Sequence, residues 1–284
     1  MRPASRRALP ALLSALLALA IASGGGPPPA LALDLQPLRS DRPPFFTADL
    51  AVSLDRDQRP GLSISITVPY PELEWIRIDG PATTGRLGAG VEFTVVFESR
   101  QQAELRGDAW ERRMVVADFA GTRGPNAVVL EKRTFSVPPG RCRVRILVRD
   151  LNSGARASVQ KKFDVPDYAR LPVGFADLEL GVADSTGGFR PVATRRFGAE
   201  VGRIAARASL FDRRPGPWPR RYPLQYRIRD EAGQVLISGT QDVSLAASGE
   251  PAIVRPARVE LFLGSYVFEV ELVEGKSHWR VERS

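Results

Sequence analysis

The chain is poor in the residues that most catalytic and metal sites require. Its 284 residues include one Cys, Cys142, and one His, His278. A single Cys excludes an intramolecular disulfide. Triad-type hydrolysis would have to use His278, and no Gly-x-Ser-x-Gly motif occurs in the chain. The sequence also has neither a phosphate-binding glycine loop nor Cys/His pairs at zinc spacing. We therefore expect a protein that is not an enzyme and that holds no cofactor and no metal.

Long apolar runs are also lacking, except at the N-terminus. Three Arg residues precede an apolar run over residues 8–22, which Gly and Pro residues then interrupt. The run has about 15 residues, fewer than the ~20 that a helix needs to cross a bilayer. Small residues up to Ala32 suit signal peptidase, so we expect residues 1–32 to be a cleaved signal peptide. A site near Ala22 is the second choice, and an uncleaved anchor is the alternative.

Export follows from this N-terminus. No later segment is apolar enough to span a membrane, so we expect a periplasmic or extracellular protein with no membrane span in the mature chain. An exported protein rarely meets nucleic acid. The net charge of +8 comes mostly from Arg, since only four of the 40 basic residues are Lys. Frequent Arg, Ala, Gly and Pro also accompany a genome rich in G and C, and we expect solvated basic sheet faces with no nucleic-acid partner.

The pattern of apolar residues is that of strands, and no convincing amphipathic helix occurs. Residues 62–68 alternate with even positions apolar, and residues 91–97 with odd positions apolar. Such strands recur about every 8–15 residues, which predicts an all-β fold of two tandem Ig/fibronectin-III-like antiparallel β-sandwich domains. We expect a lead-in over 33–44, domains over 45–168 and 169–284, and a Pro-containing linker over 165–172. In the second domain we expect strands at 178–182, 189–194, 201–211, 224–230, 234–243, 253–263, 266–272 and 277–283.

A β-hairpin over residues 135–165 organises the first domain. Its first strand places Cys142 among inward apolar residues, while Arg141, Arg143 and Arg145 face outward. Gly140 supplies the turn before it, and a weaker copy begins at Gly264. In that copy Tyr266 stands where Ig-like sandwiches often have a corner Tyr that bonds back to the backbone. Cys142 takes this place in the first domain, so we expect it to be a buried structural residue without that hydroxyl bond.

Two stretches are candidates for binding. The outward stripe of Arg141, Arg143, Arg145 and Arg149 would suit an anionic polymer or envelope lipid, although a neighbouring strand could supply Glu92 and Glu98 as partners. A Pro-rich loop combines aromatic and cationic residues that are frequent in interfaces: Trp218, Arg220, Arg221 and Tyr222. The alternative is that Trp218 merely plugs the end of its own sandwich.

Two further details have local explanations. Asp55 with Asp57, and Asp150 with Asn152, could offer oxygen ligands to calcium, but turn formation explains both pairs better. Alternation places Lys161 on the inward side of the return strand of the hairpin. Either a bulge re-aims this Lys, or the strand is an edge strand that Lys protects.

Five segments of the first domain together resemble a known family. They are Val68-Pro-Tyr-Pro-Glu-Leu-Glu-Trp75, Val115-Val-Ala-Asp-Phe119, Phe135-Ser-Val-Pro-Pro-Gly140, Val148-Arg-Asp-Leu-Asn-Ser-Gly154 and Phe163-Asp-Val-Pro-Asp-Tyr168. Their order resembles the β-rich N-terminal portion of GWxTD-domain-containing bacterial proteins, over about residues 45–182. No GWxTD sequence occurs, and Cys142 replaces the Tyr expected after the turn. The resemblance implies an exported bacterial envelope protein built of sandwich modules, and no catalytic residue.

These observations favour a non-enzymatic protein-binding or scaffolding module of the bacterial cell envelope. Its partner would be another envelope or secreted protein, and the sequence leaves the oligomeric state open. One alternative is an accessory binder of envelope polyanion or glycan through the Arg stripe or the Trp218 loop. The other is an enzyme that uses scattered carboxylates, which would meet only in space.

Overall fold

The structure is a computed structural model that describes residues 35–55, 57, 59–78, 80, 85–99, 106–124, 127–186 and 188–284. The expected signal peptide and the start of the lead-in lie outside these residues. The described chain is all-β, and its helices are short 3-10 turns: η1 (Tyr70–Glu72), η2 (Ala120–Thr122), η3 (Tyr168–Arg170) and η4 (Gly198–Arg203). No helix in the described part is long and apolar enough to cross a membrane.

The first half of the chain forms two antiparallel sheets. Sheet A has the order β1-β2-β3-β7, with strands β1 (Leu38–Arg39), β2 (Thr47–Leu54), β3 (Pro60–Pro69) and β7 (Val128–Ser136). Sheet B has the order β4-β5-β8-β9, with β6 also paired to β5: β4 (Ile76–Ile78), β5 (Arg86–Ser99), β6 (Arg106–Val116), β8 (Gly140–Asp150) and β9 (Arg156–Val165). One apolar core lies between them.

The second half repeats this arrangement. Sheet C has the order β11-β10-β12-β15, with β10 (Val173–Ala183), β11 (Phe189–Pro191), β12 (Ile204–Asp212) and β15 (Pro251–Val254). Sheet D has the order β14-β13-β16-β17, with β13 (Arg220–Asp230), β14 (Val235–Leu245), β16 (Tyr266–Glu274) and β17 (Ser277–Arg283). A second core lies between sheets C and D. We call sheets A and B the first sandwich and sheets C and D the second.

The alternation of apolar residues places the cores as the sequence predicts. In β3 the even residues from Leu62 to Val68 are buried in the first core, as are the odd residues from Val91 to Phe97 of β5. The hairpin of β8 and β9 forms at the predicted position, with an unshifted register. Lys161 therefore needs no bulge, and β9 is an edge strand of sheet B.

Two strands predicted in the second half of the chain differ from the structure. The strand expected over 253–263 ends at Val254, because Pro256 has no N–H to donate to a ladder. The strand expected over 201–211 begins as η4, and β12 starts only at Ile204.

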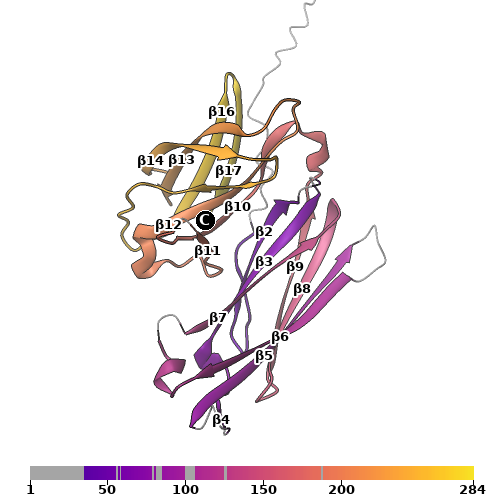
Figure 1. Ribbon diagram of the computed structural model, residues 1–284, viewed down its shortest axis with the longest axis vertical. Helices are drawn as coiled ribbons and strands as arrows, with labels where there is room; N and C mark the ends of the chain where they lie inside the picture. The colour runs from indigo at the N-terminus through magenta and orange to yellow at the C-terminus, as the bar shows by residue number, and fades with distance from the viewer. Residues whose placement is uncertain are drawn as a thin grey trace, which may run out of the picture.

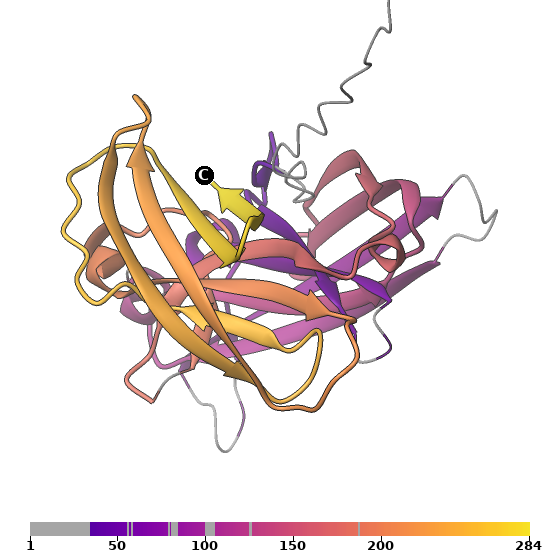
Figure 2. The same ribbon diagram turned by 90° about the horizontal axis from the view of Figure 1, so that it is seen from above.

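The two sandwiches are stacked through sheets A and C. The face of sheet A that points away from the first core carries Asp49, Ser63 and Ser65, yet all three are buried. Strands β10 and β12 of sheet C contact β2 across this face, and Figure 1 shows β10 beside β2. The layers therefore run B, A, C, D. Figure 2 shows the orange and yellow strands of sheet D in front of the magenta strands of the first sandwich.

The segment expected to be a linker is part of this packing. Tyr168 in η3 is 1% exposed, and its hydroxyl donates a hydrogen bond of 2.8 Å to the carbonyl of Ala176 in β10. Its ring meets Phe211 edge to face at 5.7 Å between centroids. A buried aromatic ring with a bonded hydroxyl fixes the direction in which the chain enters the second sandwich.

Candidate functional site

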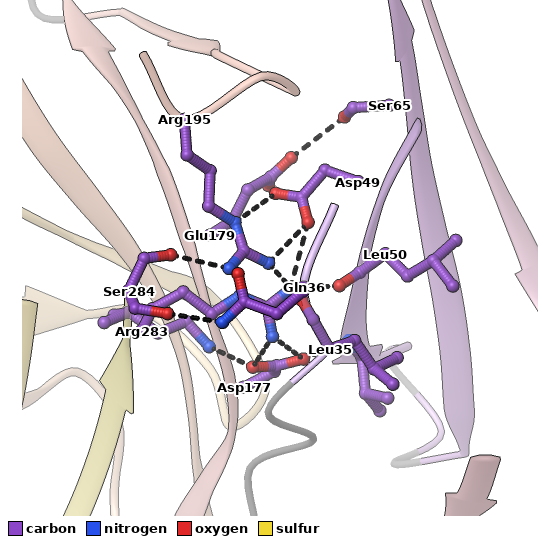
Figure 3. A network of polar contacts seen from close by, with 12 residues as sticks. Leu35, Gln36, Asp49, Leu50, Ser65, Asp177, Glu179, Arg195, Arg283 and Ser284 are labelled. Carbon is purple, nitrogen blue, oxygen red and sulfur yellow. Dashed lines mark hydrogen bonds and ion pairs between the residues drawn. The ribbon is translucent and has the colours of Figure 1, made fainter. Parts of the chain in front are cut away.

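A cluster of charged residues lies between sheets A and C, where both sandwiches contribute (Figure 3). Its acids are Asp49 from β2 and Asp177 and Glu179 from β10. Its cations come from four other places in the chain: Lys132, Arg195, Arg207 and Arg283. We call these seven residues the interface cluster. Burying a charge is costly unless it is paired and hydrogen-bonded, and here each charge meets an opposite one.

Arg283 lies at the centre of the interface cluster. It is at the end of β17, and its guanidinium is fully buried. One nitrogen lies 3.1 Å from an oxygen of Asp177, and the other lies 3.3 Å from Asp49. The same guanidinium donates to the carbonyl of Leu50 in β2. The last strand of the second sandwich is thereby bonded to the first sandwich.

Arg195 binds Asp49 from the other side. Its guanidinium lies 2.7 Å from Asp49 and also donates to the carbonyls of Leu35 and Ser284. In the described part of the chain Arg195 is the only residue other than Gly with a positive φ, at 50°. This backbone state costs about 1–3 kcal/mol and persists only where surrounding contacts enforce it. The side chain of Gln36 adds a hydrogen bond of 2.7 Å to Ser284.

Glu179 collects the remaining cations. Lys132 of β7 lies 2.8 Å from its carboxylate, Arg207 of β12 contacts the same oxygen, and Ser65 of β3 donates at 3.1 Å. Burial raises the pKa of Glu179 to about 8, and the nearby Asp49 carboxylate adds to the rise. Burial also raises the pKa of Asp177 to about 6, against the opposing effects of Arg283 and of backbone N–H donors.

The interface cluster has the character of a structural joint. Its charges are paired with one another, and its three acids together with Arg195 and Arg283 are buried between two sheets, while Lys132 and Arg207 are partly exposed. The described residues contain no group of three or more His, Cys, Asp or Glu side chains placed to hold a metal ion. This arrangement fixes one sandwich on the other, because Asp49, Asp177 and Glu179 each accept a hydrogen bond from the other sandwich.

Sequence reasoning missed the interface cluster, although a signal was present. The tripeptide Ala-Asp-Leu occurs at residues 48–50 and again at residues 176–178, each time inside an apolar strand. These strands are β2 and β10, which face each other across the joint. In both strands an Asp stands between apolar residues, which indicates that both faces of the strand are buried. Each Asp then needs a buried partner.

The predicted Arg stripe faces outward on sheet B, and much of its charge is paired. Arg143 lies 2.9 Å from Glu98 of β5, and Arg141 lies 3.6 Å from Asp164 of β9. Arg145 is exposed beside them. Arg149 also reaches Glu92, at 3.7 Å. The pairing of Arg143 and Arg149 with Glu98 and Glu92 follows directly from the register of β5 and β8.

The Pro-rich loop divides into surface and core. Tyr222 is 2% exposed and lies in the second core, and Trp218 packs against the edge of that core. The guanidinium of Arg220 stacks over the Trp218 ring at 4.8 Å and pairs with Asp212 at 2.9 Å. Arg221 points outward. The structure therefore places Trp218 against the core of its own sandwich, with Arg220 stacked on it, while Tyr222 is withdrawn from the surface.

The predicted structural residues form two equivalent corners. The hydroxyl of Tyr266 donates a hydrogen bond of 2.9 Å to the carbonyl of Phe262, and the thiol of Cys142 lies 3.8 Å from the carbonyl of Pro138. Each bond spans four residues backward. Gly140 has a φ of 105°, which favours Gly, and a side chain at Gly264 would crowd the Tyr266 ring.

The two proposed calcium ligand pairs are engaged in local structure. Asp55 accepts the N–H of Arg59 at 2.8 Å and so closes a turn. Asp150 accepts the N–H of Glu74 at 2.7 Å and the hydroxyl of Ser153 at 2.7 Å. The side chain of Asn152 donates to the carbonyls of Glu74 and Gly88. These oxygens and amides hold the β8–β9 turn against β4 and β5, as turn formation predicts.

Comparisons with known proteins add little to these observations. No protein-family model and no curated protein matches the chain. Among solved structures, it is similar to the dimeric latent PorU from Porphyromonas gingivalis, at 12% identity and a TM-score of 0.30 over 83% of this chain. The match covers 20% of the PorU chain, so this chain spans about a fifth of the length of that protein. At so low a TM-score the likeness carries no conclusion about function.

Proposed function

We propose that this chain is a non-enzymatic, exported protein that acts as a protein-binding or scaffolding module of the bacterial cell envelope. The observation that carries the proposal is the joint between the sandwiches. The seven charges of the interface cluster, five of them on buried side chains, and the Tyr168 contact hold two sandwiches in one orientation. A fixed body of this kind suits a part that holds binding surfaces at a set spacing, since its orientation does not have to be ordered on binding.

Export and domain type belong to the same proposal. Residues 1–32 would be removed as a signal peptide, leaving domains over 45–168 and 169–284. Their assignment as Ig/fibronectin-III-like is supported by the Tyr266 corner, because its bond back to Phe262 is the contact by which such corners are recognised. The resemblance to GWxTD-domain-containing proteins points to the same compartment.

The two alternatives have less support. A polyanion would meet an Arg stripe in which Arg141 and Arg143 already have acidic partners. A carboxylate enzyme would use acids that reach substrate, whereas Asp49, Asp177 and Glu179 are buried and ion-paired. We therefore keep the binding module as the conclusion.

Affinity capture with chemical cross-linking tests this proposal. The tagged chain is expressed in its native bacterium, and the envelope and cytosolic fractions are compared. We expect the chain in the envelope or medium fraction, shortened by its signal peptide, and cross-linked to a partner protein in constant ratio. A full-length cytosolic product, or a chain that cross-links to no protein above background, would contradict the proposal.

A further inference from the structure

A groove opens at one end of the second sandwich, next to the joint. Its volume is about 810 Å³, within the range of about 300–1,000 Å³ that is typical of ligand pockets. The walls come from the segment before β2, from the turn that carries Arg195, and from residues 261–266. The floor is made by residues of the second core, among them Leu180, Ile228 and Phe268. The groove therefore gives access to an apolar interior.

The rim of this groove carries the most exposed large apolar side chains of the described chain. Phe262 is 93% exposed and Leu263 is 103% exposed, whereas the others in this class reach 55% at most. The hydroxyl of Tyr266 binds the carbonyl of Phe262 and so fixes this segment. Two adjacent apolar residues held in water at a groove rim are a feature of interaction sites.

The charged side chains that line the groove have one sign. Arg39, Arg195 and Arg196 line it, and no Asp or Glu does. Arg195 is occupied by Asp49, but Arg39 and Arg196 are exposed and have no ion pair with another described residue. A ligand that fits both the floor and the rim would combine apolar side chains with carboxylates.

We propose that this groove binds a segment of a partner protein in which apolar side chains stand beside Asp or Glu. The inference rests on the proposed function and names the surface and the partner chemistry for it. The exposed apolar pair and the Arg residues at the rim of this apolar groove favour a polypeptide segment, since peptide segments bind such grooves through apolar side chains and match flanking charges. A second copy docked groove to groove would place Arg39 and Arg196 close to their own copies, and like charges in an interface are unfavourable.

Selection of peptides by the purified chain tests the proposal. A phage library of random dodecapeptides is panned on the wild-type chain at low salt, and selected peptides are synthesised with a fluorophore. Fluorescence anisotropy then measures Kd for wild type, for Phe262→Ser/Leu263→Ser and for Arg39→Glu/Arg196→Glu. All of these substitutions lie at exposed positions, and circular dichroism checks that each variant folds.

Matched controls carry the same chemistry elsewhere on the surface. Val235→Ser/Leu236→Ser removes two exposed apolar residues from β14, and Arg258→Glu reverses an exposed charge. We expect selected peptides that combine apolar and acidic residues. Their Kd should rise about tenfold or more in both groove variants and less than about twofold in the controls. For the wild-type chain, Kd should also rise with salt concentration, because salt screens the attraction between Arg39, Arg196 and the acidic residues of the peptide.

Three results would overturn the groove proposal. One is a selection that yields no binding peptide, or peptides that bind wild type and groove variants equally. The second is that no peptide is selected, while the wild-type chain binds phosphatidylglycerol vesicles and the Phe262→Ser/Leu263→Ser variant alone does not. The third is self-association in sedimentation that both groove variants abolish. If every variant still cross-linked to the same envelope protein, the proposed function would stand, but the proposal that the groove binds the partner would be wrong.

Discussion

Arg283 is the side chain on which the joint depends most directly. Replacement by Met would leave Asp177 and Asp49 buried without their shared counter-charge. Breaking a buried pair on one side costs about 3–5 kcal/mol, so we expect Arg283→Met to lower the free energy of unfolding by that amount. Urea unfolding measures it. Arg280→Met is the matched control, because Arg280 is half exposed and pairs with Glu269 at 3.6 Å, and its loss should cost about 0–1 kcal/mol. Equal losses in the two variants would refute the role given to Arg283.

The burial of Cys142 leads to a second prediction about a single residue. Burial raises the pKa of its thiol, and the nearby Asp164 carboxylate adds to the effect. Since the thiolate is the reactive form, we expect slow modification by Ellman's reagent at neutral pH, with a rate that increases as pH rises. A Ser153→Cys variant in the β8–β9 turn, which is exposed, serves as the comparison within the same chain. Modification of Cys142 at the rate of Cys in that turn would contradict its burial.

Single residues were predictable where their reason is local. Cys142 and Tyr266 were placed at corners from the turns before them, and both make the backward contact. Tyr222 was misjudged as a surface residue because the Pro-rich loop seemed to extend to it, whereas β13 has already begun at Arg220. The charges of the interface cluster could not be paired from sequence, since Asp49 and Arg283 are separated by 234 residues.

Among the elements, the connection between β12 and β13 is organised by one acid. Asp212 accepts hydrogen bonds from Arg214 and Tyr222 and pairs with Arg220. Burial alone would raise the pKa of Asp212, but the bonds from Arg214, Tyr222 and Arg220 outweigh it and hold the pKa well below its ordinary value. The Pro-rich loop is therefore tied at both ends.

This acid gives the second sandwich a dependence on low pH. A carboxyl whose pKa is lowered by folding adds stability above its unfolded value of about 4, and this stability is lost as the pH falls below it. We expect the thermal midpoint to drop between about pH 4 and pH 2. Asp212→Asn should be less stable at neutral pH and should show a flatter profile in this window. Identical profiles for the two proteins would show that another group is responsible.

The strands themselves were the most predictable level. Alternation places Leu62, Val91 and Val144 toward the first core because one face of each strand is buried. The same logic misled for Ser63 and Ser65, which look like solvent-facing residues and are covered by the second sandwich. Periodicity reports the polarity of a face, and only the packing of whole sheets decides whether a polar face meets water.

At the scale of the whole molecule, the stability that the joint confers should change with pH in the direction opposite to that of Asp212. Folding raises the pKa of Asp177 to about 6 and that of Glu179 to about 8. The folded chain therefore retains protons that the unfolded chain releases, and its stability falls as the pH rises from about 4 to about 8. We expect a lower urea midpoint at about pH 8.5 than at about pH 5.

Glu179→Gln tests the origin of this slope. The amide keeps the shape of the protonated acid and does not titrate, so the loss of stability between about pH 5 and pH 8.5 should become smaller. Glu231→Gln, in the exposed β13–β14 turn, should leave the slope unchanged. A stability that rises with pH in the wild-type chain would contradict the assignment.

The contacts of Arg195 have a mechanical consequence. Leu35 and Ser284, the first and last described residues, both accept bonds from this one side chain, and Gln36 is bonded to Ser284 directly. The first and last described residues are thus held close together. Tension applied at these two residues would be borne by the Arg195 and Gln36 bonds first and would peel them apart one after another. The stacked sheets would carry load only after these hydrogen bonds had broken.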